Sequence, residues 1–162
     1  MCKVKLLILL LISSSLFSCS SSPVQSKHSF SLDYIGGAED GLIFSNLLTS
    51  YLNDYSLFNP SSRLMIKASI THEQDLYITN VDNTSDREKI KSTITLSIFD
   101  QLNDCNIFHY KSSENQFYVI TDTVNYTSNN IAIEQIKFRN NEALIQKLIP
   151  HIVDIEVNCL DE

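Results

Sequence analysis

The chain has 162 residues, which is enough for one domain and too few for two ordinary ones. Hydrophobic residues make up 43% and charged residues 19%, so the composition supports a packed core and excludes an intrinsically disordered chain. The formal net charge of -7 argues against a nucleic-acid binder, which needs a basic face. The glycines, Gly36, Gly37 and Gly41, form neither a dinucleotide fingerprint nor a complete phosphate-binding loop.

The first 18 residues have the pattern of a bacterial secretion signal. A basic start precedes an unbroken apolar run, residues 6–12, which is too short to span a bilayer. Leu16 lies three residues before Cys19 and a small residue lies directly before it, an arrangement that resembles a lipobox. We therefore expect residues 1–18 to be a lipoprotein signal peptide and Cys19 to be lipidated. The alternative is an ordinary signal peptide with a chance cysteine.

The residues after the cysteine indicate where such a protein is sorted. Several acyl chains on Cys19 would give firm anchoring in a membrane. Ser20 is not the aspartate that retains lipoproteins in the inner membrane, so we expect the outer membrane, with the protein on its periplasmic side. Residues 19–28 are small and polar, which is typical of a flexible tether. Residues 29–158 then form a single domain.

Two further cysteines, Cys105 and Cys159, are present in the mature part of the chain. A disulfide between them suits an oxidising compartment, and closing so long a loop is worth ~4 kcal/mol in the chain-entropy model. The alternative is two unpaired thiols, and the spacing does not decide between them. The chain has no Cys-x-x-Cys pair, which argues against a thioredoxin-like redox role.

The domain begins with a strand pattern and a helix pattern. Residues 29–35 alternate polar and apolar side chains, which predicts a strand with one buried face. Asp40 is a candidate helix cap, and apolar residues from Ile43 to Tyr55 recur at helical spacing. Pro60 then ends this element.

Three later segments alternate polar and apolar side chains or are rich in β-forming residues, which predicts further strands. They are residues 64–71 with a short extension at 76–78, residues 89–98, and residues 107–110 and 117–126 on either side of a polar break at 111–116. The last pair forms one interrupted strand or two. Residues 103–106, which precede it, are turn-like.

The final element is an apolar stripe at helical spacing that starts near Ser128 or Asn130 and includes Leu144 to Val153. Pro150 lies inside it and should kink or stop the helix, and the residues after it also alternate like a strand. We favour a kinked helix. The order is therefore β-α-β-β-β-α, which predicts an α+β fold: a two-layer sandwich with about four strands packed against two helices.

No motif in the sequence predicts catalysis or metal binding. His72 and Glu73 begin like a zinc-protease motif, but its second histidine is missing. Residues 80–86 alternate oxygen-bearing side chains as a calcium loop does, yet lack its glycine and final glutamate. We expect no metal, no cofactor and no enzymatic activity. The rival is a hydrolase with dispersed residues, which would place a hydroxyl or thiol beside His72, His109 or His151 in a deep pocket.

One group of charges is more informative. Arg87, Lys89 and Lys91 follow one another at every second residue, so they share one face of a predicted strand. Lys67 lies on the polar face of the neighbouring predicted strand. In an acidic chain, cations gathered on one sheet face form a candidate site for a phosphorylated ligand. The alternative is a solvated face whose lysines keep an edge strand soluble.

The lipobox-like segment, the tether and the order of elements together resemble the lipopolysaccharide (LPS)-assembly lipoprotein family, LptE. Residues 31–35 and 41–52 look like the first strand and helix of that family. Arg87 looks like its loop arginine, and residues 140–148 look like its final helix. The resemblance covers roughly residues 19–157 and rests on pattern and order more than on fixed residues.

This resemblance implies a non-enzymatic protein with two partners besides the membrane that holds its lipid anchor. It would plug the LptD β-barrel of the outer membrane, help that barrel to fold, and bind LPS that arrives across the periplasm. Some family members have a basic ligand contact in the part that corresponds to residues 121–130, where this chain has no Lys or Arg. We therefore expect Arg87, Lys89, Lys91 and Lys67 to face lipid A or core phosphates. The rivals are an auxiliary lipoprotein of an ABC-type lipid transporter and an outer-membrane lipoprotein with another binding role.

Overall fold

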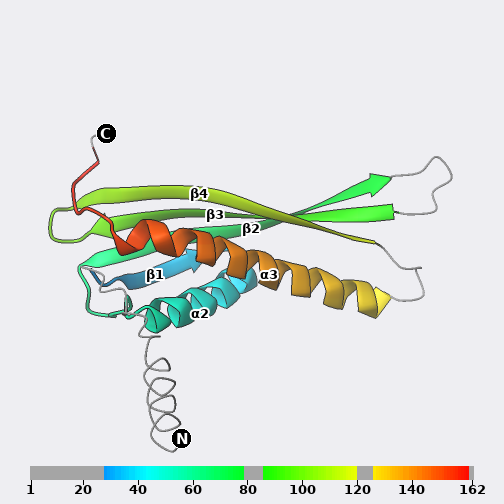
Figure 1. Ribbon diagram of the computed structural model, residues 1–162, viewed down its shortest axis with the longest axis horizontal. Coiled ribbons are helices and arrows are strands. Elements are labelled where there is room, and N and C mark those ends of the chain that lie inside the picture. Colours follow the sequence, from blue (N-terminus) through cyan, green and yellow to red (C-terminus); the bar gives the residue numbers. More distant parts are fainter. Residues whose placement is uncertain (1–27, 79–85, 120–125, 161–162) are drawn as a thin grey trace, which may run out of the picture.

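The computed structural model describes residues 28–78, 86–119 and 126–160, and Figure 1 shows their arrangement. Their order is β1 (Ser31–Gly36), α2 (Ala38–Asp54), β2 (Leu64–Ile78), β3 (Asp86–Asp100), β4 (Cys105–Val119) and α3 (Tyr126–Val153). The strands form one four-stranded sheet in the order β1-β2-β3-β4, and both helices lie against the same face of it. The predicted α+β sandwich and its element order are confirmed.

The sheet is mixed and has two unequal ends. Strand β1 is parallel to β2 and pairs with it only over Met65–Ser69, whereas β2, β3 and β4 are antiparallel and 15 residues long each. Strands of that length extend for about 50 Å. We call the end that β1 and α2 cover the proximal end. The distal end contains the far halves of β2, β3 and β4 and the first half of α3 (Figure 1).

The hydrophobic core lies between the sheet and the two helices. Inward side chains recur at every second residue of a strand and at every third or fourth residue of a helix, so the patterns seen in the sequence meet on one side. The fully buried core residues include Ile66, Ile70, Ile94, Leu96 and Ile98 from the strands, and Phe44, Leu48, Leu52, Leu144, Leu148 and Ile152 from the helices.

Helix α2 begins differently from the prediction. Gly37, and not Asp40, occupies the N-cap position, with a φ of 123° that side chains other than glycine rarely adopt. A Cβ at Gly37 would lie 2.7 Å from the carbonyl oxygen of Ile70. Asp40 lies inside the first turn, where its negative charge faces the positive end of the helix dipole. The prediction that Asp40 caps the helix is therefore wrong.

Two strands are longer or more continuous than the sequence indicated. Strand β2 continues without a break to Ile78, and β4 is one uninterrupted strand through the polar residues 111–116. The predicted strand over residues 117–126 is wrong at its end, because Val119 is the last residue of β4 and Tyr126 begins α3. Backbone pairing with β3 holds this polar segment in place, since each of its residues has a partner there.

Helix α3 starts a little earlier than expected and continues past its proline. It begins at Tyr126 and includes Pro150, which does not stop it. The proline lies in the last turn, where a missing backbone donor affects few hydrogen bonds before the helix ends at Val153. No helix in the described ranges combines the length and apolarity needed to cross a membrane.

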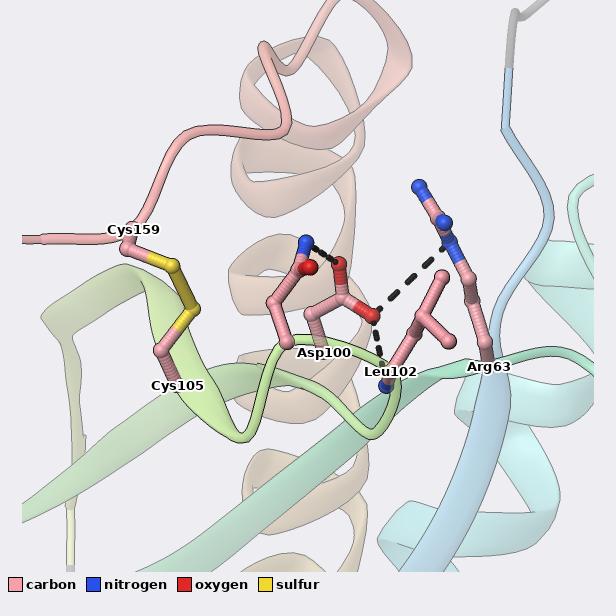
Figure 2. The surroundings of a disulfide bond; sticks show 6 residues. Arg63, Asp100, Leu102, Cys105 and Cys159 are labelled. Atoms are coloured by element: carbon pink, nitrogen blue, oxygen red, sulfur yellow. Dashed lines mark hydrogen bonds and ion pairs between the residues drawn. A yellow bond between two sulfur atoms is a disulfide. The ribbon is translucent and has the colours of Figure 1, made fainter.

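The chain returns from α3 to the proximal end, where Cys105 and Cys159 form a disulfide (Figure 2). The S–S distance is 2.03 Å and the Cα atoms are 5.7 Å apart, so of the two alternatives the structure contains the bonded one. The backbone N–H of Leu160 donates to the carbonyl of Asn106 at 2.9 Å, which adds a second contact between the C-terminal segment and β4.

A buried carboxylate fixes the neighbouring β3–β4 turn. Asp100 has no exposed surface and accepts hydrogen bonds from the Leu102 N–H at 3.0 Å and the Asn103 side chain at 2.8 Å. Arg63 approaches the same carboxylate at 3.8 Å, as Figure 2 shows. Because its polar partners surround it, this buried charge stabilises the turn.

Candidate functional site

The candidate site lies on the face of the sheet that the helices leave open. Arg87, Lys89 and Lys91 occupy alternate positions of β3 and share this open face, as predicted. They lie in the distal half of the strand and span about 13 Å along it. The side chain of Arg87 is exposed and those of the two lysines are half-buried.

Two of these three cations stand opposite a carboxylate of β2, and the third does not. Lys91 stands opposite Glu73 of β2, and its Nζ lies 3.2 Å from the Glu73 carboxylate. Lys89 stands opposite Asp75 in the same register. Arg87 has Tyr77 and Val119 as its register partners, so no carboxylate stands directly across from it. Arg87 is therefore the cation best placed to receive an anion from outside.

Apolar side chains lie beside the cations on the same open face. Phe117 of β4 is 53% exposed and stands opposite Lys89, and Val119 is 54% exposed and stands opposite Arg87. Both side chains therefore present apolar surface to solvent on this face. We call Arg87, Lys89, Phe117 and Val119 the distal open-face patch. Its mixture of positive charge and apolar surface suits an amphiphile with an anionic head.

Lys67 does not belong to this patch. Its register partner is Ser97, six residues from Lys91 along β3, which places it about 20 Å away. Its Nζ lies 4.5 Å from the centre of the Phe99 ring, a cation–π contact. The structure thus brings three of the four predicted cations together and separates the fourth.

A second polar group, on the helix side of the sheet, was missed by the sequence reasoning. His72 Nδ1 lies 2.7 Å from Ser92 Oγ, and the Asn140 amide donates to Ser92 Oγ at 3.0 Å and to the Ile90 carbonyl at 3.3 Å. Which of Ser92 Oγ and His72 Nδ1 donates depends on the tautomer of the imidazole. Asn140 was detectable only as a polar residue at a position of the apolar stripe.

The electrostatics of His72 follow from its place under α2 and α3. Burial lowers the pKa of His72 below its ordinary value. Asp40, 3.9 Å from Nε2, opposes that shift, the Lys137 ammonium adds to it, and Glu134 opposes it. Lys137 lies 3.8 Å from Asp40 and 3.0 Å from Glu134, so it already supplies the cation between these two carboxylates.

The series Asp40, His72 and Ser92 resembles the carboxylate, imidazole and hydroxyl of a hydrolase. Ser92 has no exposed surface, however, so no substrate reaches its oxygen. A pocket of about 580 Å³ lies on the outer side of α3, around Ile131 and Phe138, and none of the three residues lines it. This arrangement therefore joins α3 to the sheet and gives the hydrolase rival no accessible nucleophile.

The other residues singled out from the sequence lie apart. His109 is exposed on the open face of β4, and the His151 ring packs 5.4 Å from that of Tyr110. Among the residues described, no three His, Cys, Asp or Glu side chains are grouped so as to hold a metal ion. Cys19 with the signal and tether up to residue 27, and the calcium-loop candidates 80–85, lie outside the described residues.

The fold is similar to that of solved bacterial lipoproteins. A minor lipoprotein from Acinetobacter baumannii superimposes with a TM-score of 0.57 at 13% identity, over 77% of this chain and 90% of that one. Rare lipoprotein B from Shewanella oneidensis has a TM-score of 0.54 at 7% identity, over 76% and 96% of the two chains. A candidate lipoprotein from Caulobacter crescentus has a TM-score of 0.53 at 11% identity, over 76% and 87%. At these identities the likeness shows a shared fold.

Comparisons of the sequence with protein families and with curated proteins find no match. The likeness is thus visible in the arrangement of strands and helices and not in residue identity.

Proposed function

We propose that this protein is an outer-membrane lipoprotein of LPS transport and assembly, anchored through acylated Cys19 on the periplasmic side. In this role it plugs an LptD-type β-barrel, helps the barrel to fold, binds LPS and catalyses no reaction. The observation that carries the proposal is the fold: an α+β domain that aligns with 96% of rare lipoprotein B follows a lipobox-like segment.

The distal open-face patch supports the ligand part of the proposal. A lipid A or core phosphate at Arg87 and Lys89 would gain charge-assisted hydrogen bonds, which are roughly twice as strong as neutral ones. An acyl chain or sugar ring would lie against Phe117 and Val119, which are about half exposed. Lys91 is already paired with Glu73, so it contributes less.

Purification with its natural partners tests the assembly part. We expect a C-terminally tagged protein, extracted from native membranes in mild detergent, to bring with it a large outer-membrane β-barrel in near-equal amount. A Cys19→Ala variant, which cannot be acylated, should bring down far less barrel. Recovery of the tagged protein alone, or with an inner-membrane ATPase, would contradict the proposal and favour the auxiliary lipoprotein of an ABC-type transporter.

Charge reversal tests the ligand part separately. We expect Arg87→Glu with Lys89→Glu to weaken LPS binding at least tenfold, because two charge-assisted contacts are replaced by repulsion. The matched control reverses the charges of Lys67 and Lys111, which lie on the same open face but outside the patch. The assay is retention of LPS by the immobilised protein. Binding that survives the first pair of changes, or falls equally with the second, refutes this site.

A further inference from the structure

One edge of the sheet extends well beyond its neighbouring strand. Strand β1 pairs with β2 only as far as Ser69, whereas β2 continues to Ile78. Within the described part of the chain, no strand pairs with Thr71–Ile78 on the side away from β3. We call this segment the β2 distal edge; in Figure 1 it forms the far end of the green β2 ribbon. Alternate backbone N–H and C=O groups of an outer strand point away from the sheet, where a further strand would bond them.

Beyond His72, residues 73–76 of the β2 distal edge are open on both faces of the sheet. The four side chains of residues 73–76 are all exposed, although they alternate between the open face and the helix face. Leu76 is on the helix face, yet it is 59% exposed. Helix α3 packs against β3 and β4, and α2 packs against β1 and the part of β2 that ends at His72, whose side chain lies 3.9 Å from Asp40 of α2. Within the described part of the chain, an incoming strand would meet neither helix along residues 73–76.

Two of the devices that normally protect an edge strand are missing here. Proteins blunt such edges with proline, bulges or charges. The segment has no proline, and its register with β3 runs without a shift along the whole strand. It does have two exposed carboxylates, Glu73 and Asp75, and the ion pair of Glu73 with Lys91 is itself open to solvent. These charges disfavour an acidic strand at this edge and favour a basic one.

We propose that the β2 distal edge binds an extended segment of another protein, which adds to the sheet as a further strand. The added strand has basic or hydroxyl side chains opposite Glu73 and Asp75, and an apolar side chain against Leu76. Main-chain hydrogen bonds supply affinity, and these three contacts supply selectivity. This inference goes beyond the proposed function and does not depend on LPS binding.

A second copy of this chain is the wrong occupant. When two β2 edges pair antiparallel over most of their length, Glu73 stands opposite Asp75 of the other copy, or Asp75 stands opposite itself. Like charges directly across a strand pair are destabilising. A foreign strand with complementary charge has no such penalty.

The test uses the full acylated protein in an uncharged detergent and capped nine-residue peptides as probes. One peptide alternates lysine and valine, a second alternates glutamate and valine, and a third has proline at its centre. We expect the lysine peptide to bind about tenfold more tightly than the glutamate peptide, measured by fluorescence anisotropy. It should also slow amide hydrogen exchange in residues 71–78. The proline peptide should bind weakly, because it cannot complete the ladder.

Variants separate this edge from general attraction to an acidic protein. Glu73→Gln with Asp75→Asn should reduce the preference for the lysine peptide by about threefold to tenfold. The matched control, Asp33→Asn with Glu39→Gln, removes two exposed carboxylates elsewhere and should leave it unchanged. Equal binding of the lysine and glutamate peptides, protection of other amides, or no protection at all would overturn the proposal. So would a concentration-dependent dimer that protects residues 71–78 without peptide.

Discussion

Removing the disulfide between Cys105 and Cys159 should lower the stability of this domain by an amount that its position predicts. The bond closes a loop with a sequence separation of 54 residues. In the chain-entropy model such a loop removes about 14 cal/mol/K from the unfolded chain, which amounts to about 4 kcal/mol at 25 °C. For a domain of roughly 130 residues, this corresponds to a melting temperature about 15 °C lower.

The assay is urea unfolding of the purified protein, followed by circular dichroism, with and without a reductant. The Cys105→Ser/Cys159→Ser variant should lose about 4 kcal/mol in the free energy of unfolding. Reduction of the unchanged protein should reproduce that loss. The reductant should have no effect on the double variant, which controls for other actions of the thiol.

A loss below about 1 kcal/mol would refute the loop-closure reasoning. Hydrogen exchange of the Leu160 amide then tests whether the disulfide holds only the C-terminal segment. This N–H donates to the Asn106 carbonyl at 2.9 Å beside the disulfide. If the variant exchanges this proton faster while its free energy of unfolding is unchanged, the bond holds only the C-terminal segment. If neither quantity changes, the disulfide makes no measurable contribution to the fold.

Three further predictions concern buried positions: His72, which contacts Ser92, then Gly41 and Leu48 of α2. The free energy of unfolding in urea measures each of them. Burial lowers the pKa of His72 below 6.5, so as the pH falls the unfolded chain binds the proton before the folded one does. The free energy of unfolding should therefore be highest above about pH 6.5 and should fall by on the order of 1 kcal/mol per pH unit below it. The His72→Gln variant should lack this pH dependence. Gly41→Ala should destabilise the domain by more than about 1 kcal/mol, because the new Cβ would lie 2.6 Å from the Ile35 carbonyl oxygen. The intrinsic preference of alanine for helices is too small to offset this clash. The control, Ser50→Ala at an exposed site of the same helix, should be neutral or slightly stabilising. Leu48→Ala, at a fully buried site, should cost about 3 kcal/mol. A flat pH profile, a stabilised Gly41 variant or a harmless Leu48 variant would contradict the corresponding reasoning.

The order of elements was predictable because burial of one face leaves a period in the sequence. Ile94, Leu96 and Ile98 alternate with polar residues and are all buried, and Leu144 and Leu148 repeat at helical spacing and are buried opposite them. These patterns depend only on which side chains avoid water.

Continuity within β4 was not predictable in the same way, because the inward face of its middle section is polar too. Ser112, Glu114 and Gln116 alternate with outward residues but show no apolar period. Glu114 is tolerated on the inner face because it pairs with Lys147 of α3. A partner so far away in the sequence leaves no local signal.

The candidate site was predictable in part. The alternation of Arg87, Lys89 and Lys91 placed them on one face without further information. The carboxylates opposite the two lysines, and the distance to Lys67, depend on the register of β2 against β3, which no single strand encodes. The contact between Ser92 and Asn140 joins residues 48 positions apart and shows no motif.

The way the chain enters the domain determines how a mechanical pull on its N-terminal segment is resisted. Phe30 is fully buried; its N–H donates to the Leu57 carbonyl at 2.7 Å, and its carbonyl accepts from the Asn59 N–H at 2.9 Å. Strand β1 follows at once and pairs with β2 in parallel. Tension along β1 therefore acts in shear, across all of its hydrogen bonds together, and does not open them one by one. A domain tethered at this end would unfold under force only when the hydrogen bonds between β1 and β2 break together.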